Sequence, residues 1–337
     1  MPQVRSIFLS LTGAVALIAA PALAHAADFY KGKTVTIIVG FSPGGGYDSY
    51  ARAVARRLRD HIPGRPTVVV QNMPGAGSLT AARSLDVTEP KDGTVMATFN
   101  AGLITQSIVE PSKVQLDFQK FAWIGVVTPD FRVCYGFGPK GVKTWDQMMH
   151  AKRFILGSTG KGSGNYINGA TLREVFKAPV KQVLGFPGSA QQRIAIEQGE
   201  LDGDCGSLSS IPIEWLRDHK AHPFVRFNEQ RPPEMTKSAV FVDTFATTKG
   251  QKQLLSLLDS ANAVGRALVM SNQVPADRVA IMRKAFDDTM KDPAFLADMK
   301  KQHLPVNPLS WRKAEASIGQ MSKVSPATLA LARKIYE

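Results

Sequence analysis

The sequence predicts an α/β protein made of two units, each a mostly parallel sheet flanked by helices. Strand-like and helix-like segments alternate from residue 35 to 98 and again from residue 132 to 227. In each unit a glycine-rich turn joins a strand to the helix that follows it. Because parallel strands are usually connected through a helix, right-handed crossovers are expected in both units.

The first unit follows from short apolar runs bounded by turn residues and from segments with apolar residues at helical spacing. The run at 35–41 reads as a buried strand, and the segment at 48–61 has the pattern of an amphipathic helix. The expected strands span 35–41, 66–71 and 94–98, and the expected helices span 48–61 and 78–87.

The second unit repeats the alternation of strand and helix patterns. Its expected strands span 132–137, 154–157, 180–185, 201–205 and 223–227, and its expected helices span 145–151, 165–177 and 190–198. The regular order of these elements again favours a parallel sheet covered by helices.

The C-terminal part is expected to begin with a strand over 263–270 and to continue with helices only. One helix starts near Pro275 and carries an apolar stripe at helical spacing, which is typical of a packing face. The stripe consists of Val279, Met282, Phe286 and Met290. Further helices are expected over 293–302, 310–321 and 326–336, so this part suits a tail that wraps a completed sheet.

The N-terminus has the pattern of a secretory signal peptide. Arg5 precedes an apolar segment from Ile7 to Ala20, and Ala24-His25-Ala26 matches the A-x-A cleavage pattern. The apolar segment is short for a membrane span, so an N-terminal anchor helix is the weaker interpretation. We expect residues 1–26 to be removed by cleavage after Ala26 and the mature chain to be exported and soluble.

The formal net charge is +13. The cations are scattered along the chain and are not interleaved with stacking aromatic residues, so the composition argues against a nucleic-acid module. A basic surface of this kind can raise the local concentration of an anionic ligand. Cys134 and Cys205 form an even pair in an exported chain, which favours a disulfide over two separately buried thiols. No C-x-x-C motif supports a zinc site or a redox site.

The first glycine turn, GFSPGGGYD, is open to three interpretations. A nucleotide site is disfavoured because Gly44, Gly46 and Ser49 stop short of G-x-G-x-x-G and because the chain has no P-loop motif. A secreted serine hydrolase is suggested by the G-x-S-x-G pattern around Ser42. The residue after this serine is Pro43, however, which lacks the backbone N–H that an oxyanion hole requires.

The third interpretation is an anion site. Gly44, Gly45 and Gly46 leave backbone N–H groups uncovered at the positive end of a helix, which suits a carboxylate, phosphate or sulfate. Asp48 lies where an N-cap residue is expected, and it could instead accept a hydrogen bond from a ligand hydroxyl or amine.

Two further turns in the second unit have the same character. One runs from Gly157 to Asn165 and offers small hydroxyl groups and backbone amides, although Ser163 or Asn165 could serve only as a helix cap. The other includes Gly188 and Ser189 before the helix over 190–198. Two or three helix N-termini that converge on one cleft would suit a ligand with a carboxylate at each end, and they predict a binding site without a catalytic residue, a metal or a cofactor.

Several motifs in order make the chain resemble the extracytoplasmic solute receptors of tripartite tricarboxylate transporters, the TctC or Bug-type proteins. Phe41, Gly44, Gly45, Asp48, Ala51 and Arg52 match the family's P-F-x-x-G-G-x-x-D-x-x-A-R turn, while Gly40 replaces the proline. The other matching segments are 72–77 (NMPGAG), 90–94 (PKDGT), 160–163 (GKGS), 187–189 (PGS) with 200–202 (ELD), and 274–279 (VPADRV).

The resemblance implies a two-lobed periplasmic binding protein fold of the second type, which closes around a small organic carboxylate. The first lobe would comprise 28–131 and 230–337, and the second lobe 132–229. It also implies a periplasmic monomer that hands its ligand to the membrane subunits of a transporter, with no enzymatic activity and no nucleic acid partner. The implied ligand contacts are Ser42, Gly44, Gly45, Gly46, Tyr47, Asp48, Asn100, Ala101, Ser158, Thr159, Lys161, Gly162, Ser163, Asn165, Gly188 and Ser189.

The chain departs from the family pattern at three positions. Tyr166 stands where many relatives have histidine, and Tyr47 and Lys161 are bulkier than usual. Lys161 could pair with a ligand carboxylate, and Tyr47 could stack on an aromatic acid. A divergent branch of the family carries cysteine where this chain has Cys205, which strengthens the expectation of a bridge to Cys134. A hydrolase using Ser42 and a binding protein that feeds a sensor remain the alternative functions.

Overall fold

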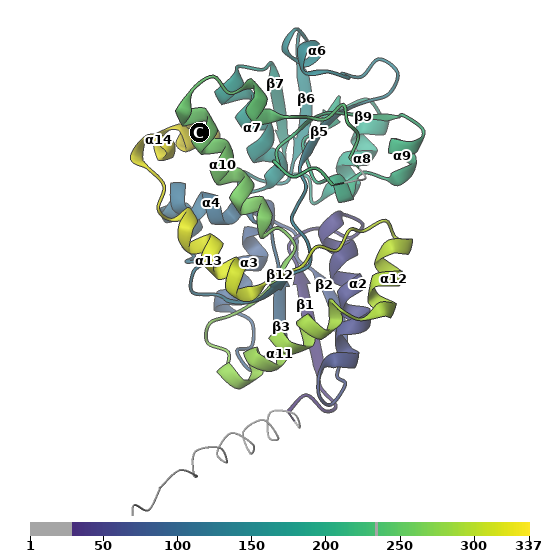
Figure 1. Cartoon of the computed structure of the whole chain (residues 1–337), viewed down its shortest axis with the longest axis vertical. Coiled ribbons are helices and arrows are strands. Elements are labelled where there is room, and N and C mark those ends of the chain that lie inside the picture. The colour runs from purple at the N-terminus through teal and green to yellow at the C-terminus, as the bar shows by residue number, and fades with distance from the viewer. Residues whose placement is uncertain (1–28, 233–234) are drawn as a thin grey trace, which may run out of the picture.

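The computed structural model describes residues 29–232 and 235–337, and two six-stranded sheets organise it (Figure 1). We call the part around the first sheet the first lobe and the part around the second sheet the second lobe. The expected signal peptide and its cleavage after Ala26 lie outside the described residues. Within the described residues, no helix combines the length and the apolar composition needed to cross a membrane.

The first sheet has the strand order β12-β4-β11-β3-β1-β2. Strand β1 pairs in parallel with β2 and β3, whereas β11 and β12 pair antiparallel with their neighbours. The strands are β1 (Thr34–Val39), β2 (Thr67–Asn72), β3 (Val95–Thr98), β4 (Ala122–Val126), β11 (Ala267–Met270) and β12 (Leu309–Ser310).

The second sheet has the order β10-β9-β5-β8-β6-β7. Strand β5 is antiparallel to both β8 and β9, and the other pairings are parallel. The strands are β5 (Val133–Phe137), β6 (Phe154–Ser158), β7 (Val180–Leu184), β8 (Gly203–Asp204), β9 (Ala221–Arg226) and β10 (Val240–Phe241).

Helices cover the faces of both sheets (Figure 1). Those near the first sheet are α2 (Gly46–His61), α3 (Leu79–Val87), α4 (Gly102–Val109), α5 (Pro111–Val114), α11 (Ala276–Thr289), α12 (Pro293–Lys301) and α13 (Trp311–Met321). Those near the second sheet are α6 (Trp145–Met149), α7 (Gly164–Phe176), α8 (Ser189–Glu197) and α9 (Ile213–Arg217). Helices α10 (Lys249–Ala263) and α14 (Pro326–Tyr336) pack on each other, and they connect α4 of the first lobe with α7 of the second.

The core of the first lobe confirms the packing face expected in the tail. The apolar stripe of α11 and the residue after it is buried against α2 and the first sheet. Phe286 lies so close to β4 that a side chain on Gly125 would overlap its ring. The buried stripe residues are Val279, Met282, Phe286 and Met290.

The α/β class and the two-lobed architecture are confirmed, but both sheets are mixed rather than mostly parallel. In the first sheet the antiparallel strands are β11 and β12, which do not belong to a βαβ unit. The chain returns from the second lobe before β11, and β11 then enters the sheet between β3 and β4. The sequence patterns also missed α4, β4 and α10, and they placed only helices after residue 270, where β12 adds one short strand.

The lobe boundaries at 131–132 and 229–230 stay a prediction. Strand β10, at Val240–Phe241, pairs with β9 and so extends the second sheet beyond residue 229. Helix α10 then leads back to β11 in the first sheet.

Candidate functional site

A small pocket with a cavity volume of about 40 Å³ lies between the two lobes. Residues from the first glycine turn form one wall, and residues from α7, α8, β8 and the segment after β8 form the other. The lining residues are Phe41, Gly45, Gly46, Tyr47, Asn100, Arg132, Thr159, Ser163, Asn165, Ser189, Gln192, Asp204, Gly206, Ser207 and Ser210. Eight of them were expected from the sequence, namely Gly45, Gly46, Tyr47, Asn100, Thr159, Ser163, Asn165 and Ser189.

The first glycine turn is stabilised by a side chain of the helix that follows it, Asp48 of α2. Helix α2 begins at Gly46 with Gly45 as the N-cap, so Asp48 is the third helical residue rather than the cap itself. Its carboxylate accepts a hydrogen bond from the backbone N–H of Gly44 (3.0 Å) and pairs with Arg52 (2.9 Å). Gly44 has a φ of 86°, a conformation that glycine adopts without strain.

Asp48 therefore stabilises the turn and does not line the pocket. Asn72 donates a further hydrogen bond to its carboxylate at 2.9 Å. Burial acts to raise the pKa of Asp48, but the hydrogen bonds from Arg52, the Gly44 N–H and Asn72 outweigh it and lower that pKa below its ordinary value.

The two lobes touch directly around this turn. The backbone N–H of Gly46 donates to Ser210 Oγ (3.1 Å), and the backbone N–H of Ser42 donates to the Pro187 carbonyl (3.1 Å). Arg193 of the second lobe donates to the Gly44 carbonyl at 3.0 Å. Part of the hydrogen-bonding capacity that the sequence offered to an anion is thus used for contact between the lobes.

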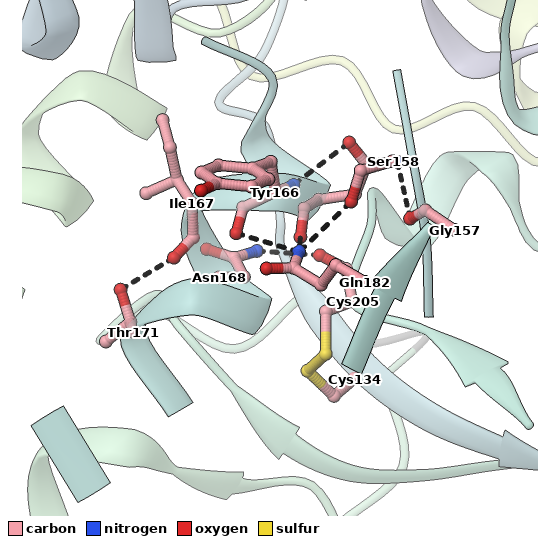
Figure 2. The surroundings of a disulfide bond; sticks show 10 residues. Cys134, Gly157, Ser158, Tyr166, Ile167, Asn168, Thr171, Gln182 and Cys205 are labelled. Carbon is pink, nitrogen blue, oxygen red and sulfur yellow. Dashed lines mark hydrogen bonds between the residues drawn. A yellow bond between two sulfur atoms is a disulfide. The ribbon is translucent and has the colours of Figure 1, made fainter. Parts of the chain in front are cut away.

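The second glycine turn is held by side chains of the second lobe (Figure 2). Ser163 is the N-cap of α7, and its hydroxyl donates to the Gly160 carbonyl at 2.6 Å. The Gln182 amide on β7 donates to Ser158 Oγ (3.0 Å) and to the Tyr166 carbonyl (3.0 Å). Ser158 is consequently a support of the turn and does not line the pocket.

The third turn supplies the N-terminus of α8. Gly188 is the N-cap, and Ser189 is the first helical residue and lines the pocket. A side chain on Gly188 would overlap Ser42 Oγ, which shows how closely this turn approaches the first lobe. The Ser42 hydroxyl donates to the side chain of Gln191 at 2.8 Å.

Lys161 points away from the pocket. Its ammonium donates to the backbone carbonyls of Tyr336 (2.6 Å) and Glu337 (2.9 Å) at the end of α14. The expectation that Lys161 pairs with a ligand carboxylate does not fit this arrangement, because the C-terminal carbonyls already accept its hydrogen bonds. The other expected residues that do not line the pocket are Ser42, Gly44, Asp48, Ala101, Ser158, Gly162 and Gly188.

A buried ion cluster beside the pocket was not foreseen. Asp130 pairs with Arg132 (2.6 Å) and with Arg266 (3.1 Å), and all three side chains are buried. The Arg266 guanidinium lies over the Tyr47 ring at 3.9 Å from its centroid. Burial, together with the nearby Asp130, raises the pKa of Tyr47 to about 12. Tyr47 is therefore already stacked by a cation, and no motif surrounds Arg132 or Arg266 that would have revealed them.

Two further unforeseen residues present buried polar atoms without partners. Gln192 is 1% exposed and neither end of its amide is hydrogen-bonded, and Asp204 is 5% exposed and its Oδ1 has no hydrogen-bond partner. Thr159 Oγ1 and Arg132 Nε are also unpartnered. An unpartnered buried polar group costs about 1–3 kcal/mol, so these groups suit a polar ligand.

Burial raises the pKa of Asp204 to about 6, although Arg132, the Cys205 N–H, Arg193 and Asn165 act to lower it. The backbone at this position is fixed. A disulfide joins Cys205 to Cys134 on β5, and Asn168 of α7 donates to the Cys205 carbonyl at 2.8 Å (Figure 2). The bridge expected from the sequence is thus present immediately after Asp204.

Within residues 29–232 and 235–337, no hydrogen bond joins Ser42 to a histidine, and no group of three or more His, Cys, Asp or Glu side chains is placed to hold a metal ion. What the arrangement offers is hydrogen bonding and charge in a small pocket.

The chain matches no model of a known protein family. A UPF0065 protein from the TAR-I ttuE-ttuC' intergenic region of Agrobacterium vitis is 22% identical over 281 residues, which is 82% of this chain and 77% of that protein. Protein BugT of Bordetella pertussis is 45% identical over 76 residues, which is 23% of this chain and 21% of BugT.

Solved structures of solute-binding proteins share the fold. The periplasmic binding protein BugD superposes with a TM-score of 0.73 at 19% identity, covering 91% of this chain and 98% of BugD. MatC from Rhodopseudomonas palustris with bound malate gives a TM-score of 0.68 at 18% identity, covering 90% of this chain and 99% of MatC. An R. palustris protein with adipate gives 0.66 at 16% identity, covering 88% of this chain and 97% of that protein. The chain is thus similar in sequence to UPF0065 and Bug proteins, and it shares the fold of the periplasmic binding protein BugD.

Proposed function

We propose that this protein is a periplasmic receptor that captures a small organic carboxylate and delivers it to a tripartite tricarboxylate-type transporter. The observation that carries the proposal is the polar pocket between the lobes, where three helix N-termini meet unpartnered buried polar groups. Helix N-termini favour anions because their N–H groups and the helix dipole face the ligand.

The ligand carboxylate would lie between the N-termini of α2 and α8, the two helices that begin at Gly46 and Ser189. Both residues line the pocket, and they come from different lobes. Arg132 supplies positive charge on the second-lobe side. The expected contacts that do not line the pocket would act by shaping the turns, as Asp48 and Ser158 do.

Binding would favour closure of the lobes. A ligand can shift a conformational equilibrium only by its difference in affinity for the two states, so it must contact both lobes in the closed state. The hydrogen bonds between Gly46 and Ser210 and between Gly77 and Thr159 (3.2 Å) are contacts that an opened cleft would lose.

Cleavage after Ala26 would accompany export to the periplasm, and the membrane subunits of the transporter would be the partners. MatC and the adipate-bound neighbour are solute-binding proteins whose ligands are small carboxylates, which supports the class of ligand. Mass spectrometry of the chain purified after export tests the cleavage site directly, because a cut at any other bond changes the mass.

The test of the proposed function is a thermal-shift screen of the exported protein against mono-, di- and tricarboxylic acids and aromatic acids. A ligand at a hundred times its Kd should stabilise the fold by ~2.7 kcal/mol, which shifts the midpoint by several degrees. A folded protein, freed of any ligand carried through purification, that shows no shift with any acid would contradict the proposal.

A further inference from the structure

The pocket contains an acidic side chain where only anion-binding groups were expected. Asp204 on β8 lines the same pocket as the helix N-termini, and its Oδ1 has no hydrogen-bond partner. An ionised carboxylate is a hydrogen-bond acceptor only, and it repels a ligand carboxylate placed beside it. The part of the ligand that meets Asp204 must therefore donate a hydrogen bond.

Gln192 on α8 lines the same wall of the pocket. Its amide oxygen and nitrogen are both buried and both unpartnered, so it can accept from a ligand group and also donate to one. Thr159 is a third side chain on this wall with an unpartnered polar atom, its hydroxyl oxygen Oγ1. The second lobe thus presents a cluster of unpartnered hydrogen-bond donors and acceptors. A ligand that has only carboxylate oxygens cannot donate a hydrogen bond to the acceptors among them.

The charged side chains around the pocket carry one net positive charge, which one ligand carboxylate would balance. Asp130 is shared between Arg132 and Arg266, at 2.6 and 3.1 Å. Arg193, which also acts on Asp204, is the third nearby guanidinium. Three guanidinium groups against two carboxylates give one positive charge when both acids are ionised, so a second ligand carboxylate would have no counter-charge.

Resting on the proposed function, we propose that Asp204 and Gln192 form a donor-recognising subsite, so that the pocket selects carboxylates bearing a hydroxyl or ammonium group over the same acids without one. A site built to hydrogen-bond a ligand donor discriminates strongly against the analogue that lacks it, because its own buried groups are then left unpaired.

The test is isothermal titration calorimetry of the exported protein with matched acids that differ by one donor group. The probes are lactate and alanine against propionate, and malate and aspartate against succinate. We expect at least one donor-bearing acid to bind at least tenfold more tightly than its unsubstituted partner. Unsubstituted acids that bind as tightly as their partners would overturn this inference while leaving the proposed function intact. Absence of binding by every carboxylate would instead refute the proposed function, and the inference with it.

Two variants assign the discrimination to Asp204. Asp204→Ala removes the acceptor, so the preference should fall to within about threefold. Asp204→Asn keeps an acceptor oxygen and removes the charge, so it should keep the preference for a hydroxyl and lose the preference for an ammonium group. Asp202→Asn is the matched control, because Asp202 is exposed two residues away on the same segment, and it should leave the preference unchanged.

A preference that survives in Asp204→Ala would overturn the role of Asp204. If Asp204→Ala fails to fold, Gln192→Leu provides the second test of the subsite, and the affinity ratios of the matched acids can still be measured on the unsubstituted protein.

The pH dependence of binding distinguishes ligands with an ammonium group from ligands with a hydroxyl group. Arg132, Arg193 and Tyr135 are the charged and titratable groups that act electrostatically with Asp204. Affinity for an ammonium ligand should fall as the pH drops below about 6, where Asp204 becomes protonated, whereas a hydroxyl ligand should be affected less.

Discussion

Each wall of the pocket contains a glycine-rich turn at a helix N-terminus, but the polar groups of the two walls are used differently. In the first-lobe turn, the N–H groups of Gly44 and Gly46 already have partners, in Asp48 and in Ser210 across the cleft. The second-lobe wall keeps open polar groups, on Gln192 and Asp204. Under the proposed function, the first-lobe turn would chiefly support closure, while the second lobe would select the chemical groups of the ligand.

The largest expected effect comes from blocking closure at Gly46. A Cβ atom there would lie 2.5 Å from Ser209 Oγ and 2.8 Å from Arg266 Nη2, both held in the buried polar cluster. Gly46→Ala should lower ligand affinity at least a hundredfold, about 2.7 kcal/mol, measured by calorimetry. Gly250→Ala, where a Cβ meets nothing within 4 Å, is the matched control and should bind normally. Normal binding by Gly46→Ala would show that closure at this turn is not required.

The next effect concerns the internal support of the first-lobe turn. Asp48→Ala removes the acceptor for the Gly44 N–H, for Asn72 and for Arg52. Because these groups are partly buried, we expect a loss of about 2 kcal/mol in the free energy of unfolding, measured by urea titration. Asp60→Ala removes only the exposed pair with Arg65 and should change stability by less than about 0.5 kcal/mol. Equal effects of the two substitutions would contradict the supporting role of Asp48.

Substitution of Asp204 in the second-lobe wall should raise the free energy of unfolding instead of lowering it, because the buried carboxylate destabilises the ligand-free protein. Its pKa is raised to about 6 from 3.8, so the folded state favours the protonated form. The stability contributed by protonated Asp204 is fully present below about pH 4 and is lost as the pH rises through about 6. Asp204→Asn should therefore stabilise the ligand-free protein by on the order of 1–2 kcal/mol at pH 7.5.

The pH profile of this difference is the control. Thermal unfolding at pH 4 should show little difference between Asp204→Asn and the unsubstituted protein, since in the folded state Asp204 is then protonated and, like asparagine, uncharged. A variant that is less stable at pH 7.5 would indicate that Asp204 has a structural role instead.

The smallest expected effect is at Lys161. The hydrogen bonds from its ammonium to the carbonyls of Tyr336 and Glu337 tie the second glycine turn to the C-terminus and not to the ligand. Lys161→Met should change ligand affinity less than about threefold and lower the free energy of unfolding by about 1 kcal/mol. A tenfold or greater loss of affinity would show that Lys161 turns into the pocket when the ligand binds.

The local parts of the fold could be predicted from the sequence. Each glycine turn lies between a strand and a helix, where apolar runs and small residues indicate it, and the α11 stripe is buried as its spacing predicts. The antiparallel entry of β11 could not be predicted, because it depends on a chain that leaves the first sheet and returns after the second lobe is complete.

The site divides in the same way. Gly45, Gly46, Ser163 and Ser189 were found because helix N-termini have a local signature. Arg132, Gln192 and Asp204 have no such signature, since long-range packing alone brings them to the pocket. The hydrogen bonds of Lys161 could not be predicted from local sequence, because its partners lie more than 170 residues away, at the C-terminus.

The account is tested most directly by a crystal structure of the exported protein with the carboxylate that binds most tightly in the matched series. We predict that the carboxylate of the ligand lies between the N-termini of α2 and α8 and that its hydroxyl or ammonium group lies within hydrogen-bond distance of Asp204. A ligand bound outside the pocket, or one that contacts only a single lobe, would contradict the account.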